Sequence, residues 1–404
     1  MVAWEIGDQA DVKKNKRVLF LGNLAVAYNR DVLRGAADYA SRQPNIRVFF
    51  PDNFEIADFP LLIRGNIHGV ITAGSPPSWE LPRLIAEKDI PAIDVSAEVP
   101  VSSLPRVVTD DFAVGRLAAD YFIDRGFRRL TYYGMENRYW SNARRDGFFA
   151  RASERGLTAQ YFFKREGEAE DRADVYPSTA VRWLKKLVPP AAIYAGDDLL
   201  GIYLVEACHR LKIKVPESLA ILGTDNDDLY GQLRRPHLSS IALDTHTIGF
   251  RGMDMLYQLM RRRKVKTTQL RIPPLRVVTR LSSDIFGVDD TLVRQGLALI
   301  QQNLPKGVSV KWLAKQLGVS RPTLERHFAA AIGRSPATEI QRVQMEKARN
   351  LLADSDMPIA QISEETGYSS PRQFSTSFHT FYQNTPRDMR KLMRKEAEKN
   401  RTNA

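Results

Sequence analysis

The sequence lacks several features that mark particular classes of protein. Cys208 is the single cysteine among 404 residues, so the chain can form no internal disulfide. No apolar run approaches the ~18 residues that a membrane span needs, and residues 1–17 are polar and mixed in charge, unlike a secretory signal. Walker-type phosphate loops, HExxH and GxSxG do not occur, and the six histidines lack metal-ligand spacing. We therefore expect a cytoplasmic protein that is not an enzyme, with no cofactor, metal or membrane partner.

Positive charge is concentrated towards the C-terminal end. The whole chain has a formal net charge of +12. The 118 residues from Gly287 onward contain 18 Lys and Arg against 12 Asp and Glu, which gives +6, and the other +6 is spread over the 286 residues before them. The charge per residue is thus more than doubled in the last part of the chain. This bias permits nucleic-acid binding there, although it does not prove it.

Residues 17–282 alternate between short apolar runs and amphipathic stretches. The apolar runs predict strands at residues 17–22, 46–50, 69–73, 92–95, 129–133, 192–194 and 220–223, and the stretches between them predict helices, for example at 32–41, 114–125 and 199–211. This alternation is typical of βαβ units, so we predict a doubly wound α/β domain with parallel sheets. Several strands end in glycine or aspartate, and ligands of open α/β sheets bind at such carboxyl ends.

The polar segment 282–290 interrupts this pattern and predicts a linker at residues 283–290, after which the apolar period is purely helical. An internal repeat follows. Apolar positions 310, 313, 314 and 317 precede Gly318, and the same spacing recurs at 359, 362, 363 and 366 before Gly367. Positions 324, 328 and 336 then correspond to 374, 378 and 386. Each copy predicts a helix, a glycine turn and a second helix, which is a helix-turn-helix unit.

Polar residues at the predicted helix ends support these units. Ser309 and Asp356 can cap the two leading helices, with Pro358 just inside the start of the second. Gly318 and Gly367 supply the left-handed backbone that ends them. The second helices are expected to begin at Ser320 and at residue 369 or 370. Their polar sides fit a DNA major groove, so we predict DNA contacts from Arg321, Thr323, Glu325, Arg326, Arg372, Gln373, Ser375 and Thr376.

A predicted helix at residues 337–353 joins the two units. About 17 helical residues span roughly 25 Å, so the two recognition helices could lie about one DNA turn apart, ~34 Å. One chain could then reach two successive major grooves of double-stranded DNA. The alternative is an all-α protein-interaction module with a solvated basic face, and the duplication together with the charge bias favours DNA.

The last hundred residues resemble the AraC family of transcription regulators. The resemblance rests on residues 367–378 (GYSSPRQFSTSF) and 384–387 (NTPR). It departs at Gln383, where the family usually has glycine, and Pro322 is unusual in a recognition helix. The resemblance implies a double helix-turn-helix DNA-binding domain at residues 291–391, followed by a charged tail at 392–404.

Residues 17–282 resemble the effector-binding core of the LacI/GalR repressors, which is similar to periplasmic sugar-binding proteins. The shared motifs lie in the family order at residues 108–118, 126–130, 195–198, 215–216, 221–226, 236–241 and 274–280. The resemblance implies a two-lobed sensor for a small-molecule effector of the monosaccharide class. Those repressors have a helix-turn-helix before the sensor. Residues 1–16, an N-terminal tail here, are too few for one, so DNA binding is expected from the C-terminal domain.

The same resemblance implies the residues of the effector site. Arg144 matches the effector-binding arginine of the family and Asp225 its aspartate, whereas Gly196 stands where the family often has asparagine. A polyol needs carboxylates, an arginine fork and an aromatic face. We therefore predict a ligand site formed by Tyr28, Arg30, Trp140, Arg144, Asp197 and Asp225. The alternative for each aspartate is helix capping, and for each aromatic ring it is core packing.

These expectations describe a ligand-responsive, sequence-specific transcription regulator with a pentose-like sugar as effector. We expect a homodimer that pairs through helices of the first lobe at residues 32–41 and 81–88, with RNA polymerase as a further candidate partner. One alternative is a DNA-binding regulator whose sensor is degenerate. The other is an enzyme that acts on a sugar through paired aspartates, for which the candidates are Asp110 with Asp111, Asp197 with Asp198, and Asp225 with Asp227 and Asp228.

Overall fold

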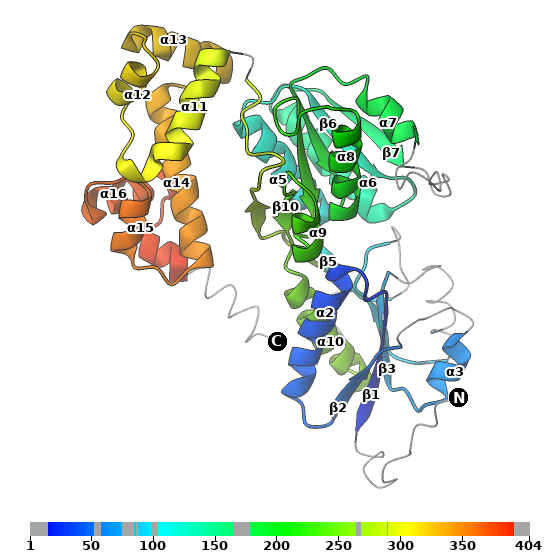
Figure 1. The fold of residues 1–404 in the computed structure, drawn as a ribbon. Helices are drawn as coiled ribbons and strands as arrows, with labels where there is room; N and C mark the ends of the chain where they lie inside the picture. The colour runs from blue at the N-terminus through cyan, green and yellow to red at the C-terminus, as the bar shows by residue number, and fades with distance from the viewer. Residues whose placement is uncertain are drawn as a thin grey trace.

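The computed structural model describes residues 15–51, 58–74, 85, 88–98, 104–164, 178–263, 268–288 and 290–391. Within these ranges the chain forms two α/β lobes and a helical C-terminal domain. Figure 1 shows the two lobes one above the other, with the helical domain beside the second lobe. Among the described residues, no helix is both long and apolar enough to cross a membrane.

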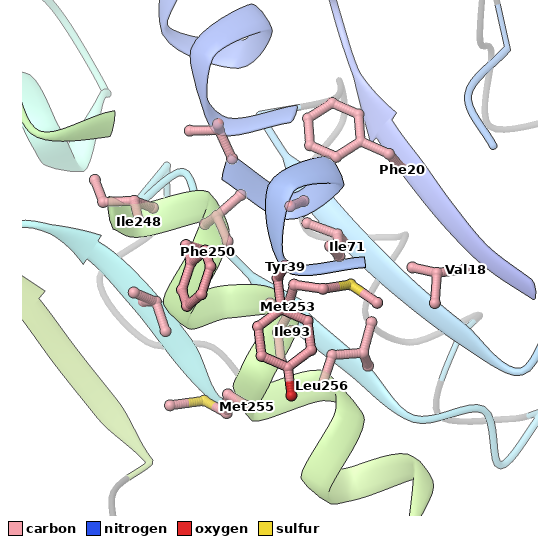
Figure 2. Close-up of a cluster of buried hydrophobic side chains, with 14 of the residues drawn as sticks. Val18, Phe20, Tyr39, Ile71, Ile93, Ile248, Phe250, Met253, Met255 and Leu256 are labelled. Carbon is pink, nitrogen blue, oxygen red and sulfur yellow. The ribbon is translucent and has the colours of Figure 1, made fainter. Parts of the chain in front are cut away.

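The first lobe is built on a parallel sheet with the strand order β11-β5-β4-β3-β1-β2. Its strands are β1 (Lys16–Gly22), β2 (Ile46–Phe49), β3 (Gly69–Ala73), β4 (Ala92–Asp94), β5 (Arg106–Thr109) and β11 (Gln269–Ile272), and its helices are α2 (Ala27–Ser41), α3 (Phe59–Ile63) and α10 (Thr245–Met260). Figure 2 shows the core of this lobe, where Phe20 and Ile71 of the strands meet Tyr39 of α2 and Phe250 of α10. Each of these side chains is at least 95% buried.

The second lobe has the same plan, with the strand order β12-β10-β9-β8-β6-β7. Its strands are β6 (Leu130–Met135), β7 (Ala159–Lys164), β8 (Ala191–Ala195), β9 (Leu219–Thr224), β10 (Ser239–Ala242) and β12 (Arg276–Val278). All described pairs in this sheet are parallel except β10 with β12. Its helices are α5 (Asp111–Asp124), α6 (Tyr139–Glu154), α7 (Ser178–Leu184), α8 (Asp198–Arg210) and α9 (Asp228–Leu233).

The chain crosses between the lobes three times. It passes from β5 to α5, returns from β10 to α10, and crosses again from β11 to β12. Such connections allow two lobes to close around a ligand by hinge motion. The predicted two-lobed α/β fold is confirmed, and every strand predicted from an apolar run is present. The apolar runs did not predict β5, β7, β10, β11 or β12. The side chains of β7, β11 and β12 are mostly exposed or half-buried, and β5 and β10 are buried but only four residues long.

Helices α5 and α6 of the second lobe cross in close backbone contact. A Cβ atom added to Gly115 of α5 would lie 1.9 Å from the carbonyl oxygen of Arg144, and one added to Gly147 of α6 would lie 2.0 Å from that of Phe112. Any larger residue would separate the helices. The two glycines therefore lock α5 and α6 into a single unit, which matters below because α6 carries Arg144.

The helical domain contains both predicted helix-turn-helix units. Its helices are α11 (Thr291–Asn303), α12 (Val310–Gln316), α13 (Arg321–Ile332), α14 (Pro336–Asp354), α15 (Ile359–Glu365) and α16 (Pro371–Tyr382), with a short 3-10 turn, η2 (Leu304–Lys306), after α11. The joining helix α14 belongs to two cores. Ile340 and Val343 contribute to the core around α11–α13, and Ala348 and Leu352 to the one around α15 and α16.

Most of the predicted helix ends are confirmed. The hydroxyls of Ser309, Ser320 and Ser370 accept hydrogen bonds from backbone N–H groups in the first turns of α12, α13 and α16. The prediction for Asp356 is wrong, because Pro358 occupies the cap position of α15 and supplies no side-chain acceptor. The first-lobe dimer helix predicted at 81–88 lies largely outside the described residues, whereas 32–41 lies within α2.

The segment predicted as a linker is anchored on both domains. Ser282 and Ser283 are fully buried, and the Ser282 hydroxyl donates to the carbonyl of Ile221 in β9 at 2.7 Å. A few residues later, Phe286 and Val288 join the core of the helical domain. The polar composition of the segment thus reflects hydrogen bonds inside the sensor and not exposure to water, so the two domains are not joined by a free tether.

The departure from the AraC pattern at Gln383 has a measurable consequence for stability. Gln383 ends α16 with φ of 55°, and the equivalent position after α13 is Gly333 with φ of 72°. Left-handed backbone costs a residue with a Cβ atom about 1–2 kcal/mol. We expect Gln383→Gly to raise the free energy of opening of α16 by roughly 1 kcal/mol, measured by hydrogen exchange. Gly333→Gln should destabilise α13 by a similar amount. If the amides of α16 and α13 exchange at the same rates in the two variants as in the wild type, this prediction is wrong.

Candidate functional site

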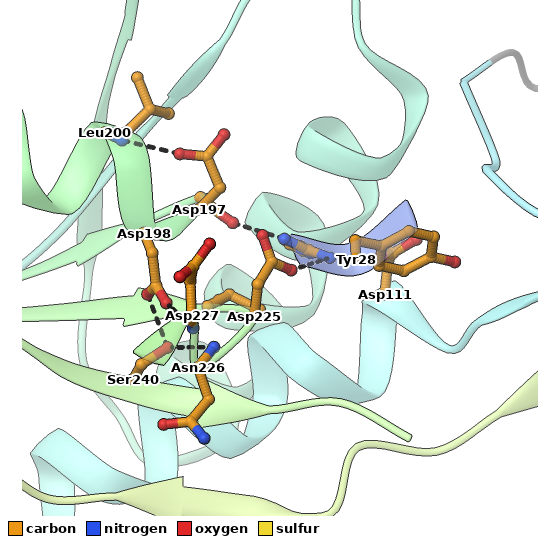
Figure 3. Close-up of polar contacts among 12 residues, drawn as sticks. Tyr28, Asp111, Asp197, Asp198, Leu200, Asp225, Asn226, Asp227 and Ser240 are labelled. Atoms are coloured by element: carbon orange, nitrogen blue, oxygen red, sulfur yellow. Dashed lines mark hydrogen bonds and ion pairs between the residues drawn. The ribbon is translucent and has the colours of Figure 1, made fainter. Parts of the chain in front are cut away.

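The polar centre between the lobes is organised around Arg144 of α6. Its guanidinium is about 95% buried. The Nε group donates to Asp111 at 2.8 Å and Nη1 donates to the carbonyl of Gly196 at 2.5 Å. Asp225 lies 3.9 Å from Nη2. Figure 3 shows Asp111, Asp197 and Asp225 gathered at the ends of strands and helices of the second lobe, as expected for a ligand site of an open α/β sheet.

Burial and mutual attraction set the charge states of this centre. Burial raises the pKa of the Asp225 carboxyl to about 7 and that of Asp111 to about 6, even though Arg144 favours both carboxylates. Burial works against the charged form of Arg144, but Asp111 and Asp225 outweigh it and raise its pKa. The centre therefore combines a permanent cation with two carboxylates that are expensive to keep charged without further hydrogen-bond donors.

The carboxylates of Asp197 and Asp198 already accept hydrogen bonds from nearby protein groups, whereas that of Asp225 faces Arg144. Asp197 caps α8 and accepts from the N–H of Leu200 at 2.7 Å, so the alternative role of helix capping holds for it. Asp198 accepts from the Ser240 hydroxyl at 2.6 Å and from the N–H of Asp227 at 2.8 Å. Asp225 caps no helix and has a φ of 104°, which is unusual for a residue with a side chain. That backbone conformation aims its carboxylate at Arg144.

Two aromatic residues flank the centre. The ring of Trp140 lies under the Arg144 guanidinium, 4.9 Å from it. Tyr28 of α2 reaches in from the first lobe and donates its hydroxyl to the carbonyl of Val95 at 2.7 Å. A Cβ atom on Gly196 would lie 2.7 Å from the Tyr132 hydroxyl and 3.3 Å from Trp140. The asparagine often found here in the related repressors would not fit, because Tyr132 and Trp140 fill its place.

Arg30 lies apart from Arg144. Its Nη1 group donates to the carbonyls of Leu24 and Ala25 at 2.9 and 2.7 Å, and Nη2 lies 3.6 Å from the Asp227 carboxylate of the second lobe. The side chain is 38% exposed. Arg30 therefore bridges the two lobes at the edge of the centre, where a change in the angle between the lobes would make or break the ion pair.

Sequence analysis did not assign Asp111 to the ligand site. Asp111 belongs to the motif at residues 108–118, but only the three-dimensional structure shows that its carboxylate lies beside Arg144. A cavity of about 250 Å³ lies beside it between the lobes, lined also by Thr109, Phe112 and Asn142. A larger hollow of about 1040 Å³, also lined by Asn142, opens beside Trp183 and Lys186. Neither hollow is lined by a predicted ligand residue, and Asp111 lines only the smaller one. The small cavity is the one adjacent to the charged centre.

The predicted DNA-contacting residues lie on one side of α13 and α16. Arg321, Arg326, Arg372, Gln373 and Thr376 are exposed, and Thr323, Glu325 and Ser375 are half-buried. Arg321 is paired with Glu325 at 2.8 Å, and Gln373 accepts from Ser369 at 3.1 Å. Within the described part of the chain, the side chains of Arg326 and Arg372 have no hydrogen-bond or ion-pair partner. These two cations are available to an outside ligand.

Comparison with known proteins supports both domains. Residues 119–283 match a periplasmic binding protein-like domain, and residues 313–392 match a helix-turn-helix domain. The xylose operon regulatory protein of Escherichia coli K12 is 28% identical over 93% of this chain and 97% of its own length. That of Haemophilus influenzae is 27% identical, covering 93% and 98%. The solved structure of a xylose-binding transcription activator covers 94% of this chain and 98% of its own, with a TM-score of 0.60 and 26% identity.

The chain is therefore a DNA-binding transcription regulator with a periplasmic binding protein-like domain and a helix-turn-helix domain. It is homologous over nearly its whole length to the xylose operon regulatory proteins. These relatives are regulators and not enzymes, so they argue against the catalytic alternative for the paired aspartates.

The raised pKa of Asp225 predicts a pH dependence of stability. A carboxyl with a folded-state pKa of about 7 and an ordinary unfolded value stabilises the fold fully below the unfolded pKa and loses this contribution as pH rises. Without ligand, the wild type should lose about 1.4 kcal/mol per pH unit relative to Asp225→Asn between roughly pH 5 and 7. Denaturation of both proteins across this range measures it, and parallel curves would contradict the assigned pKa.

Proposed function

We propose that this regulator changes its binding to a DNA operator when a neutral, pentose-like monosaccharide binds between its lobes. The observation that supports this most directly is the buried Arg144 guanidinium, held by Asp111 and facing Asp225 above the ring of Trp140. Carboxylates, an arginine fork and an aromatic face are the groups that bind a polyol. Tyr28, Arg30 and Asp197 border the same centre, and we propose that they complete the site.

The balance of charge favours a neutral sugar over a sugar acid or phosphate. Asp111, Asp197 and Asp225 together outnumber the one buried cation, Arg144, and a further anion would be repelled. Sugar hydroxyls instead donate hydrogen bonds to the two carboxylates whose pKa values are raised by burial, and so stabilise their charged forms. Because the full-length relatives are named for xylose, D-xylose is the first effector to test.

For DNA, we propose that α13 and α16 enter successive major grooves of a double-stranded operator. Joined by α14, which at 19 residues is about 28 Å long, they can be placed about one DNA turn apart. Arg326 and Arg372 would contact base edges, with Arg321, Thr323, Glu325, Gln373, Ser375 and Thr376 around them. We propose activation of a sugar-utilisation operon through contact with RNA polymerase, in the cytoplasm.

We further propose a homodimer that pairs through α2 of the first lobe, with four helix-turn-helix units in the assembly. Identical patches that contact each other across a two-fold axis give a closed dimer. Sedimentation of the full chain at micromolar concentration tests this, and a monomer that retains full operator affinity would exclude it.

The pocket is tested by Asp225→Ala. Loss of hydrogen bonds to a carboxylate costs about 1.5–3 kcal/mol, so we expect the affinity for D-xylose to fall roughly 10- to 150-fold, measured by calorimetric titration. Asp228→Ala, which removes an exposed carboxylate three residues away, should leave the affinity unchanged. Equal affinity in wild type and Asp225→Ala would exclude Asp225 as a contact. A wild type that binds no pentose, hexose or sugar acid would favour the degenerate sensor.

The DNA contacts are tested by Arg372→Ala and Arg326→Ala, with an operator selected from a random-sequence library. Each should cost about 1–3 kcal/mol on the selected site and relax base preference there. Arg349→Ala is the matched control, because it removes the same charge from an exposed position on α14. If all three variants lose equal affinity for selected and random DNA, the two arginines are phosphate contacts and their proposed role in base recognition is wrong.

A further inference from the structure

The sensor and the helical domain meet at the C-terminal end of α5. Arg334, which follows the first recognition helix α13, donates from Nη2 to the carbonyl of Asp124 at 2.6 Å. The N–H of Gly287 donates to the carbonyl of Arg125 at 3.0 Å. A Cβ atom on Gly126 would lie 2.7 Å from Val288 and 3.4 Å from Ile332, the last residue of α13. We call this contact region, formed by residues 124–127, 287–288 and 332–334, the α5 dock.

Charges of opposite sign face each other across the α5 dock. On the sensor side, Asp124 is half-buried, and this burial raises the pKa of its carboxyl, while Arg342 and Arg334 attract the carboxylate. On the helical side, burial opposes the ionisation of Glu346, but Arg125 of the sensor and Arg342 outweigh it and lower its pKa. The two surfaces are therefore complementary in charge as well as in shape, and partly buried pairs of this kind are screened little by salt.

The polar groups on the helical side are present in one repeat and absent from the other. Glu339, which is fully buried, accepts from both Arg334 and Arg342. At the equivalent positions fifty residues later the chain has Asn384 in place of Arg334 and Met389 in place of Glu339, and Met389 packs into the apolar core of its own unit. The fold of a helix-turn-helix unit thus does not need this charged cluster. The cluster occurs in the unit that touches the sensor.

The other end of α5 lies in the effector pocket. Its first residue, Asp111, holds the buried Arg144 at 2.8 Å. A helix of 14 residues is about 21 Å long, and it is locked against α6 by Gly115 and Gly147. Because a helix with a packed partner moves as a rigid body, a shift at Asp111 is passed to the residues at its far end.

We propose that α5 is the connection through which the effector pocket controls the first recognition helix, with Asp111 and Arg334 as positioning residues at its two ends. This inference rests on the proposed effector function. When a ligand recruits Arg144, the Asp111–Arg144 pair changes, α5 shifts with α6, and the α5 dock passes the shift to the end of α13. The orientation of α13 relative to the sensor, and hence its placement in its groove, then depends on the pocket within one chain.

The coupling is measured as the ratio of operator affinities with and without saturating D-xylose. Typical couplings between sites are about 5- to 150-fold. In Arg334→Ala the ratio should fall to within twofold of one, while the affinity for D-xylose stays within twofold of wild type. Asn384→Ala, the same position in the second repeat, should keep the wild-type ratio. Gly287→Ala, whose methyl group would meet the Phe127 ring, tests the α5 dock from the other side. A wild-type ratio in both dock variants would overturn the proposal.

A second measurement needs no effector and separates this proposal from the proposed function. Hydrogen exchange of the Gly287 amide reports whether the α5 dock is closed. Asp111→Asn, in the pocket at the start of α5, should speed that exchange at least tenfold while amides in α8 keep their wild-type rate. Asp197→Asn, in the pocket at the start of α8, should leave Gly287 unchanged. If Gly287 exchanges at the wild-type rate in Asp111→Asn, α5 does not connect the two sites. If the wild-type protein does not respond to D-xylose but Asp111→Asn speeds the exchange of Gly287, only the effector assignment is refuted and the proposed connection through α5 stands.

Discussion

A buried guanidinium is costly unless its donors are satisfied and its charge is balanced, and Arg144 imposes this requirement on the whole sensor. Its partners come from three different places in the sequence: Asp111 at the first lobe crossing, Gly196 after β8, and Asp225 after β9. Satisfying one cation therefore fixes the relative positions of two helices and two strand ends. The same requirement leaves two carboxylates that need further donors, which a ligand rich in hydroxyl groups can provide.

The helical domain depends on a different constraint, the sharing of one helix between two cores. Both units take part of their core from α14, which contributes Ile340 and Val343 to one core and Ala348 and Leu352 to the other. The spacing of the two recognition helices is consequently set by a rigid element. Arg334 and Ile332 of the first unit also contact the sensor.

The repeat, the caps and the turn glycines were predictable because they depend on neighbours within a few residues. Ser309, Ser320 and Gly318 act on the backbone beside them, and their roles follow from local geometry. The prediction for Asp356 failed because α15 begins later than expected, with Pro358 at its cap position and not inside the helix.

What the sequence by itself determined was the alternation of strands and helices, the repeated helix-turn-helix and the two kinds of domain, because periodicity, turn chemistry and motif spacing are local properties. Only the tertiary structure decided that Asp111 pairs with Arg144, that Arg30 bridges to Asp227, and that residues 282–288 are anchored and not free. It also decided that the end of α5 meets the end of α13. Contacts of this kind join residues 33 to 210 positions apart, and their formation depends on how whole helices and strands pack, which no local pattern encodes.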